Sequence, residues 1–286
     1  MNDKSRIVVG IDGSESSRSA LRWALAEALL HSVPLQVVHA WHTPMLFVPD
    51  VYDPQLVEME RMDEAALRFI DRELDSVGAD GDCPVVIEPT QVQHFPGHAL
   101  VEASRQAELV VLGRRGVGGF PHELMTPKVV QVAHHAKCAV AVVPDLWDGD
   151  GQGVIVGVDG SEHAARALRW AAEEAAKRGA PLTAVMAWGL LDQRHVDPHE
   201  KYDPNYNASS ARAVLDQVIA TQLGDDVKLD REVVNDLPAR ALLEASDAAE
   251  LLVVGARGFG GFKDLLLGSV SHRCLARSTC PTVVIR

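Results

Sequence analysis

The feature that most limits how this chain can fold is an internal duplication. Val9-Gly-Ile-Asp-Gly-Ser-Glu15 returns as Val156-Gly-Val-Asp-Gly-Ser-Glu162, at a separation of 147 residues. Towards the C-terminus the separation falls to 142, as Gly113 and Gly255 show, so the second copy is five residues shorter in its middle. Solenoid repeats have periods of roughly 20–50 residues. The sequence therefore predicts a duplicated domain and not a solenoid.

The two copies meet in a segment rich in Gly and Asp, residues 145–153, which is typical of a linker. We predict one domain over residues 1–146 and a second over residues 147–286. A chain of 286 residues gives each domain enough length to bury its own core. Apolar residues make up 47% of the chain, which favours a globular protein over a disordered one.

Short apolar runs alternate with amphipathic segments in both copies, which predicts an α/β fold. In the first half we expect strands at 7–11, 35–41, 85–93, 109–112 and 139–143, and helices at 14–30, 53–77, 98–106 and 128–136. In the second half the strands fall at 154–158, 182–188, 228–234, 251–254 and 282–285. Strands that alternate with helices imply right-handed crossovers and an open parallel sheet.

Two loops in each copy are suited to hold a ligand, because open parallel sheets bind ligands beyond the carboxyl ends of their strands. The first is Gly157-Val-Asp-Gly-Ser161, matched by Gly10-Ile-Asp-Gly-Ser14. The second is Gly255-Ala-Arg-Gly-Phe-Gly-Gly261, which leads to Gly268-Ser-Val-Ser271 at a helix start. Glycines let the backbone approach a phosphate, and a helix N-terminus offers N–H groups. A glycine-rich loop that only makes a tight turn remains an equal alternative on composition alone.

The spacing Gly255-x2-Gly258-x9-Gly268-Ser269, with the Val-Gly-Val-Asp-Gly-Ser and Cys-Pro-Thr-Val-Val-Ile segments, resembles the universal stress protein family. The resemblance spans nearly the whole chain and is nearest to tandem-domain members. It implies two tandem open, mainly parallel five-stranded sheets flanked by helices, Rossmann-like and similar to adenine nucleotide alpha-hydrolases. It also implies ATP, with or without Mg²⁺, between the two loops, and pairing of the halves through their last strands.

Carried across by motif position, the resemblance implies a set of nucleotide contacts in the second half. Ala187 would contact the adenine, and Asp159 would act near the adenosine or through a bound metal. The full set is Gly157, Val158, Asp159, Ala187, Val254, Gly255, Arg257, Gly258, Gly260, Gly261, Gly268, Ser269, Val270 and Ser271.

The first half keeps only part of this pattern. Its matching residues are Gly10, Ile11, Asp12, Ala40, Gly113 and Gly116, but Thr126-Pro-Lys-Val129 stands where Gly-Ser-Val-Ser is expected. Pro127 has no N–H to donate, and a lost hydrogen bond to a charged group costs about 1.5–3 kcal/mol. We expect impaired ATP binding here, although Pro also suits the first position of a helix. Lys128, Arg114 and Arg115 would attract an anion or suit a different ligand.

Charge and composition exclude several classes of partner. The net charge is −13 and no basic cluster occurs, so we expect no binding to nucleic acid or to a membrane. No apolar run approaches the ~18 residues of a membrane helix and no leader segment is recognised, which favours a cytoplasmic protein. The scattered cysteines (Cys83, Cys138, Cys274 and Cys280) form no CxxC pair and are expected to be reduced core residues.

The favoured hypothesis is an ATP-binding regulator of stress or growth arrest, with little or no hydrolysis, that acts through an unknown protein partner. The alternatives are a slow ATP-hydrolysing or phosphotransfer enzyme and a nucleotide-independent scaffold. Asp12 and Asp159 could act as a base, but no second carboxylate or histidine recurs beside them, and no P-loop is present. His94, His98, His134 and His135 are not repeated, so we expect no metal site there. A homodimer is a further possibility.

Overall fold

The computed structural model describes residues 6–41, 55–79, 83–116, 125–145, 147, 149–188, 208–224, 227–258 and 266–286. The described residues form two compact units. The first contains the residues up to 116 and residues 126–138, and the second contains residue 125 and everything from 139 onward.

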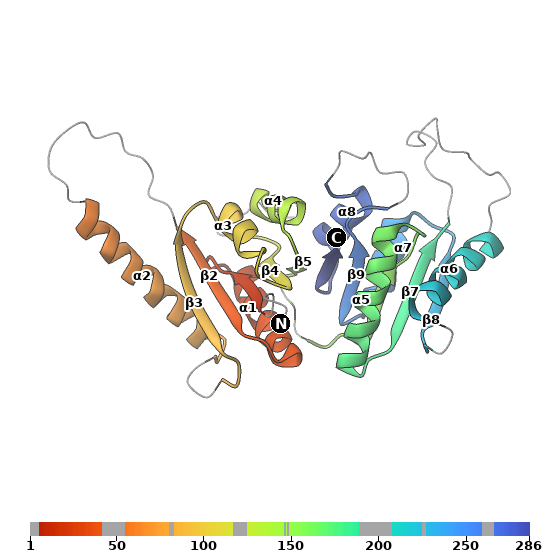
Figure 1. Ribbon diagram of the computed structural model, residues 1–286, viewed down its shortest axis with the longest axis horizontal. Coiled ribbons are helices and arrows are strands. Elements are labelled where there is room, and N and C mark those ends of the chain that lie inside the picture. The colour runs from red at the N-terminus through yellow and green to blue at the C-terminus, as the bar shows by residue number, and fades with distance from the viewer. Residues whose placement is uncertain are drawn as a thin grey trace. The chain divides into compact units, whose positions relative to one another are not determined.

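The alternation of strands and helices predicted from the sequence is confirmed in both units (Figure 1). The elements of the first unit are β1 (Ile7–Gly10), α1 (Glu15–His31), β2 (Leu35–Trp41), α2 (Gln55–Ser76), β3 (Ile87–Gln93), α3 (Pro96–Ala103), β4 (Leu109–Gly113) and α4 (Pro127–His135). Those of the second are β5 (Ala139–Val143), β6 (Val154–Gly157), α5 (Glu162–Arg178), β7 (Leu182–Ala187), α6 (Ala208–Leu223), β8 (Asp230–Val234), α7 (Pro238–Ala245), β9 (Leu251–Gly255), α8 (Ser269–Arg277) and β10 (Thr282–Ile285).

The sheet of the first unit has the strand order β3-β2-β1-β4, and all its pairs are parallel. Strand β1 is central: Ile7 is in register with Leu35 of β2 on one side and with Leu109 of β4 on the other. The chain therefore leaves β1 towards β2 and later returns to its opposite side at β4. In open parallel sheets ligands bind at such a reversal of strand order, beyond the carboxyl ends of the strands, which here are those of β1 and β4.

The sheet of the second unit repeats this order as β10-β9-β6-β7-β8, again with parallel pairs. Strand β5, which ends the first sequence repeat, adds to this sheet in the antiparallel sense, with Val140 opposite Val284 and Val142 opposite Thr282. The pairing is the one expected for the last strands of the two halves. It covers an edge of β10 that would otherwise expose unpaired backbone groups.

Each sheet is buried between two layers of helices, which explains why its strands are continuous apolar runs. In the first unit α1 packs on β1 and β4 from one face, while α3 packs on β1 and β2 from the other and contacts α4. In the second unit α5 and the pair α7 and α8 take the corresponding places (Figure 1). The central strands are almost fully inaccessible, as Val8, Val110, Val156 and Val253 show at 0% exposure.

Some element boundaries differ from the predicted ones. Strand β3 begins at Ile87, two residues later than predicted, and Val86 before it is 65% exposed. Helix α3 begins at Pro96, two residues earlier than predicted, because a proline at the first helical position needs no N–H partner and already has a helical φ. Of the four cysteines, Cys274 and Cys280 are buried as expected, whereas Cys83 and Cys138 are partly exposed.

The helix that follows the first strand is capped alike in the two units. Ser14 accepts a hydrogen bond from Ser17 N at the start of α1, and Ser161 accepts one from Ala164 N at the start of α5. Each helix also ends in a left-handed residue, but the second unit uses Gly179 (φ 62°) where the first uses Ser32 (φ 55°). Serine adopts this conformation at a steric cost that glycine does not have.

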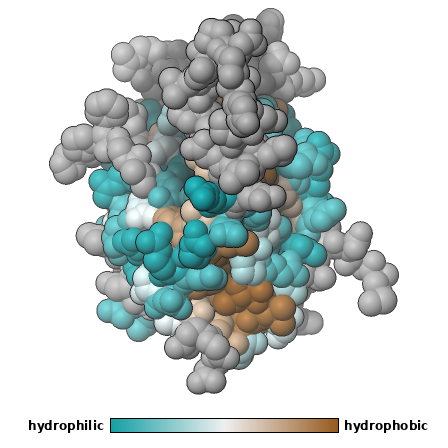
Figure 2. All heavy atoms as spheres, turned by 90° about the vertical axis from the view of Figure 1, so that its left-hand side faces the viewer, coloured by the Kyte–Doolittle hydropathy of each residue, from teal (hydrophilic) through white to brown (hydrophobic). Residues whose placement is uncertain are grey.

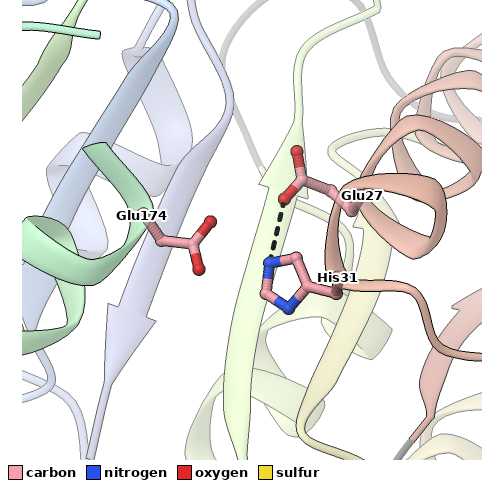
Figure 3. Close-up of side chains that lie close together, drawn as sticks. All are labelled: Glu27, His31 and Glu174. Carbon is pink, nitrogen blue, oxygen red and sulfur yellow. Dashed lines mark ion pairs between the residues drawn. The ribbon is translucent and has the colours of Figure 1, made fainter. Parts of the chain in front are cut away.

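A buried acidic network at the C-terminal end of this helix is also repeated. In the first unit His31 Nε2 lies 3.7 Å from Glu27 Oε2 (Figure 3), and His31 Nδ1 lies 2.7 Å from Glu108 Oε1. In the second unit Arg178 occupies the matching position. It lies 3.1 Å from Glu174 and 3.1 Å from Glu250. The repeat thus keeps the two carboxylates and exchanges a titratable imidazole for a permanent guanidinium.

Figure 2 views the left-hand side of Figure 1 and shows apolar surface gathered in the lower part of that face. The exposed apolar side chains of the first unit include Leu29 at 55% and Val86 at 65%. Leu29, Val77 and Cys83 help to line a shallow cavity of about 250 Å³. No helix within the described ranges has the length and apolar character needed to cross a membrane.

Candidate functional site

The described contact residues predicted for the second unit lie at the carboxyl ends of its strands or in the segments that follow them. Strand β6 pairs with β7 on one side and with β9 on the other. Gly157, Ala187 and Gly255 are the last residues of these three strands, and Val254 is buried just before Gly255. Parallel strands end at the same side of a sheet, so the loops after β6 and β9 face each other across the point where strand order reverses.

The loop after β6 is held in place by its own short side chains. Val158 is buried and its N–H bonds the Val185 carbonyl at 2.9 Å, which continues the pairing with β7. Asp159 Oδ1 then accepts a hydrogen bond from Ser161 N at 2.9 Å. The Ser161 hydroxyl accepts from Ala164 N at 3.2 Å and donates to the Arg257 carbonyl at 3.4 Å. One serine therefore caps α5 and links the loop after β6 to the loop after β9.

Two glycines of the loop after β9 allow this close approach. A Cβ atom at Gly255 would lie 2.7 Å from the carbonyl carbon of His163, in the first turn of α5. A Cβ atom at Gly258 would overlap the carboxylate of Asp159. Neither position can carry a side chain without moving backbone or the aspartate. The glycines of the motif are thus required by the packing of the two loops as well as by any ligand.

Helix α8 begins directly beside the end of β9. The Gly268 N–H bonds the Ala256 carbonyl at 2.7 Å, and the Ser271 hydroxyl donates to the Gly255 carbonyl at 2.6 Å. Gly268 is the N-cap, with φ −75° and ψ 159°, and no side chain among the described residues caps the helix. The amides of Ser269, Val270 and Ser271 therefore offer a positive helix end to an anion. Gly260 and Gly261 lie outside the described residues.

The matching residues of the first unit are placed alike. Ile11 is buried and its N–H bonds the Val38 carbonyl at 3.0 Å, as Val158 does with Val185. Gly113 ends β4 and lies against the backbone of Ser16 in the first turn of α1. The remaining predicted contacts also lie at the carboxyl ends of the strands or in the loops after them: Gly10, Asp12, Ala40 and Gly116.

The helix that follows differs between the units. Pro127 is the first residue of α4 and has no N–H, and Val129 N is bonded to the Thr126 carbonyl at 3.0 Å in a tight first turn. Residues 127, 128 and 129 correspond to Ser269, Val270 and Ser271. Pro127 has no N–H to offer a ligand, and the N–H of Val129 is already hydrogen-bonded. Both sequence interpretations of Pro127 agree with this geometry, since it starts the helix and also removes a donor.

The aspartate of the first unit has a charged partner. Lys128, in the first turn of α4, forms an ion pair with Asp12 Oδ2, while Asp12 Oδ1 accepts from Ser14 N at 3.1 Å and from the Ser14 hydroxyl at 2.6 Å. Burial acts to raise the pKa of Asp12, but the hydrogen bonds and charge of Lys128, together with Ser14, outweigh it and lower the pKa below 3.8. Asp12 is therefore an anion that is neutralised by its own chain.

A histidine of the second unit takes the place of a serine in the first. Ser16 Oγ accepts a hydrogen bond from Arg115 N at 3.0 Å, which fixes the loop after β4. At the matching position His163 stands in the first turn of α5. Its pKa is lowered from 6.5 by burial and then by the nearby charges of Arg166 and Arg257. A neutral imidazole thus borders the loop after β9.

Sequence reasoning identified the loops but missed the contacts that connect them. Lys128 was expected to attract an anion or to suit a different ligand, and its ion pair with Asp12 was not foreseen. The signal was available in the repeat, because Lys128 aligns with Val270 and is the only charge gained in that four-residue segment. His163 aligned with Ser16 is a second exchange at the same place that motif matching does not detect.

Comparison with known proteins agrees with the duplication. The model of the universal stress protein family matches residues 4–144 and again residues 152–286. A universal stress protein of Mycobacterium tuberculosis strain H37Rv is 32% identical over 293 residues, which cover 98% of this chain and 96% of that protein. A second one from the same strain is 31% identical over 301 residues, covering 100% and 97%.

Two solved structures share the fold. A universal stress protein from Archaeoglobus fulgidus DSM 4304 superimposes with a TM-score of 0.70 at 20% identity, covering 100% of this chain and 99% of that one. A functionally unknown protein from Pseudomonas aeruginosa PAO1 gives a TM-score of 0.63 at 17% identity, covering 99% and 92%. At these identities the likeness concerns the fold alone.

Proposed function

The chain belongs to the universal stress protein family, and on that premise we propose that its second half binds ATP between the loops after β6 and β9. The observation that carries the proposal is the arrangement at this edge of the sheet. The aspartate of one loop, the two glycines of the other and the start of α8, which no described side chain caps, meet where strand order reverses. A site of this kind is suited to a ligand with a phosphate chain.

The described residues divide naturally into a part for the nucleoside and a part for the phosphates. Ala187, at the end of β7, would border the adenine with Val158 and Val254. The amides and hydroxyls at the start of α8, from Ser269 to Ser271, would receive the phosphates. Asp159 would bind a ribose hydroxyl or hold Mg²⁺, because a carboxylate oxygen is a donor that suits either.

We propose binding with little or no hydrolysis. Hydrolysis of a phosphoanhydride needs a positioned water and a group that accepts its proton. Asp159 is the carboxylate nearest to that role, and its Oδ1 is engaged by the Ser161 amide. Asp12, its counterpart, is engaged by Ser14 and Lys128. Both aspartates thus act within their loops, which favours a structural and binding role over that of a base.

The biological role that fits is a regulator whose nucleotide state changes its contacts with a protein partner during stress or growth arrest. A ligand changes such an equilibrium only by the difference in its affinity for two states. The loops after β6 and β9 are tied to the starts of α5 and α8, so a ligand between them would bias the position of both helix ends.

Calorimetric titration of the full chain with ATP, with and without Mg²⁺, tests the proposal. We expect saturable binding that Asp159→Ala weakens at least tenfold, together with phosphate release close to the rate of a protein-free control. Absence of binding under both conditions would overturn the proposal. Turnover that Asp159→Ala abolishes would overturn the claim of little or no hydrolysis and favour an enzyme.

A further inference from the structure

The two copies of the site differ most sharply at one aligned position in the first turn of the helix after the glycine loop. In the first unit this position is Lys128, and in the second it is Val270. Both side chains are partly buried, so neither projects fully into solvent. Only the lysine can form an ion pair with the aspartate of the opposite loop, and it does so with Asp12.

The ion pair occupies the space between the two loops of the first unit. A Cβ atom at Gly116 would lie 2.7 Å from Asp12 Oδ2 and 2.7 Å from Lys128 Nζ, so both charged atoms rest against this glycine. In the second unit the Asp159 carboxylate rests against Gly258 in the same way. The aspartates therefore occupy equivalent places in their units. Lys128 lies at the place in the first unit that corresponds to the proposed phosphate site of the second unit.

The ion pair also changes the chemistry that the aspartate offers. A carboxylate bonded to an ammonium has less negative charge available for a divalent cation, and its Oδ2 is engaged as an acceptor. The side chains of Asp12 and Lys128 are 23% and 25% exposed, so the pair is screened by solvent only in part. A ligand that needs Asp12 must first separate the pair, and Pro127 offers no amide in return.

We propose that Lys128 acts as a built-in lock that closes the first half of this chain to ATP. This inference rests on the proposed function of the second half, since the lock is defined by the ligand it excludes. Lys128 sets which half binds nucleotide: it neutralises Asp12 and fills the gap beside Gly116. The aligned Val270 carries no charge with which to neutralise Asp159.

The reciprocal exchange tests the lock in the half that is proposed to bind. Val270→Lys places an ammonium in the first turn of α8, at the position that corresponds to Lys128, and we expect ATP affinity to fall at least 30-fold by calorimetry. Val270→Met is the matched control, because it has similar length and no charge. It reports any loss of ATP affinity that comes from side-chain bulk alone, and the loss in Val270→Lys should exceed it at least tenfold. Thermal melting of both variants shows whether each remains folded.

The same idea can be tested in the first half by creating an ATP site there. A newly gained site cannot be explained by a variant that fails to fold. Two grafts convert Thr126-Pro-Lys-Val129 towards the sequence of the second half. One carries Thr126→Gly, Pro127→Ser and Val129→Ser with the lysine kept, and the other adds Lys128→Val. We expect a second ATP site only in the graft without the lysine.

These titrations distinguish a failure of the lock from a failure of the proposed function. ATP binding that Val270→Lys leaves unchanged, or a second site in the graft that keeps Lys128, overturns the lock and leaves the proposed function standing. Two equal sites in the wild type would overturn the lock as well. A wild-type chain that binds no ATP overturns the proposed function and the lock together.

Discussion

The first and second halves of this chain have the same fold and differ in sequence at the candidate site. Strand order, the caps of α1 and α5, and the contact of each aspartate with its glycine are repeated. The differences are concentrated in the segment that begins α4 in one half and α8 in the other. In the alignment of the two halves, Thr126-Pro-Lys-Val129 corresponds to Gly268-Ser-Val-Ser271. A duplicated fold can thus keep its core while a few residues in one loop change the groups that it offers to a ligand, because function depends on the site and not on the fold.

The largest expected effect concerns the repeated acidic networks. Arg178 is 4% exposed and pairs with Glu174 and Glu250, so Arg178→Gln should destabilise the second unit by roughly 3–5 kcal/mol. His31→Gln should cost the first unit less, about 1–3 kcal/mol, because a guanidinium is permanently charged whereas an imidazole is charged only when it is protonated. Urea denaturation at pH 7.5 measures both. A larger loss for His31→Gln would contradict the comparison.

The next effect concerns the glycines beside the two aspartates. Gly258→Ala forces the Asp159 carboxylate to move, and we expect ATP affinity to fall at least tenfold by calorimetry. Gly116→Ala disturbs Asp12 and Lys128 in the same manner and should leave ATP affinity unchanged. Equal losses for the two substitutions would mean that both halves contribute to binding.

A smaller effect is expected at the left-handed ends of α1 and α5. Ser32→Gly removes the steric cost of a positive φ and should stabilise the first unit by about 0.5–1 kcal/mol. Gly179→Ser introduces that cost in the second unit and should destabilise it by a similar amount. Thermal melting monitored by circular dichroism checks the pair, and opposite signs are required.

The smallest effect is the pH dependence of the Asp12–Lys128 pair. The pKa of Asp12 is lowered in the folded chain, so the pair stabilises the fold above pH 3.8 and this contribution is lost as the pH falls below that value. Lys128→Met leaves burial to dominate, and the pKa of Asp12 should rise. NMR titration of the Asp12 carboxyl measures the change. An unchanged pKa in Lys128→Met would show that the pair contributes little.

The fold was predictable from the sequence because the buried parallel strands are continuous apolar runs and the whole pattern occurs twice. The predicted strand at 35–41 and the predicted last strands at 139–143 and 282–285 have the same limits in the structure. The pairing of Lys128 with Asp12 was not predictable in this way. The two residues are 116 positions apart, and their contact depends on how α4 is placed against the loop after β1.

The candidate site was predictable to a similar extent. The glycine spacing identified the loops, but glycine patterns do not show which side chains those glycines must avoid. Gly258 faces Asp159 and Gly116 faces Asp12 together with Lys128, which is information about packing. Comparison of aligned positions between the halves, such as Ser16 with His163, is the sequence signal that best anticipates these contacts.

The number of ATP sites on the wild-type chain tests the central claim most directly. Calorimetric titration of the full chain with ATP and Mg²⁺ gives this number without any substitution. The asymmetry of the two halves predicts one site per chain. Two equivalent sites per chain would contradict it.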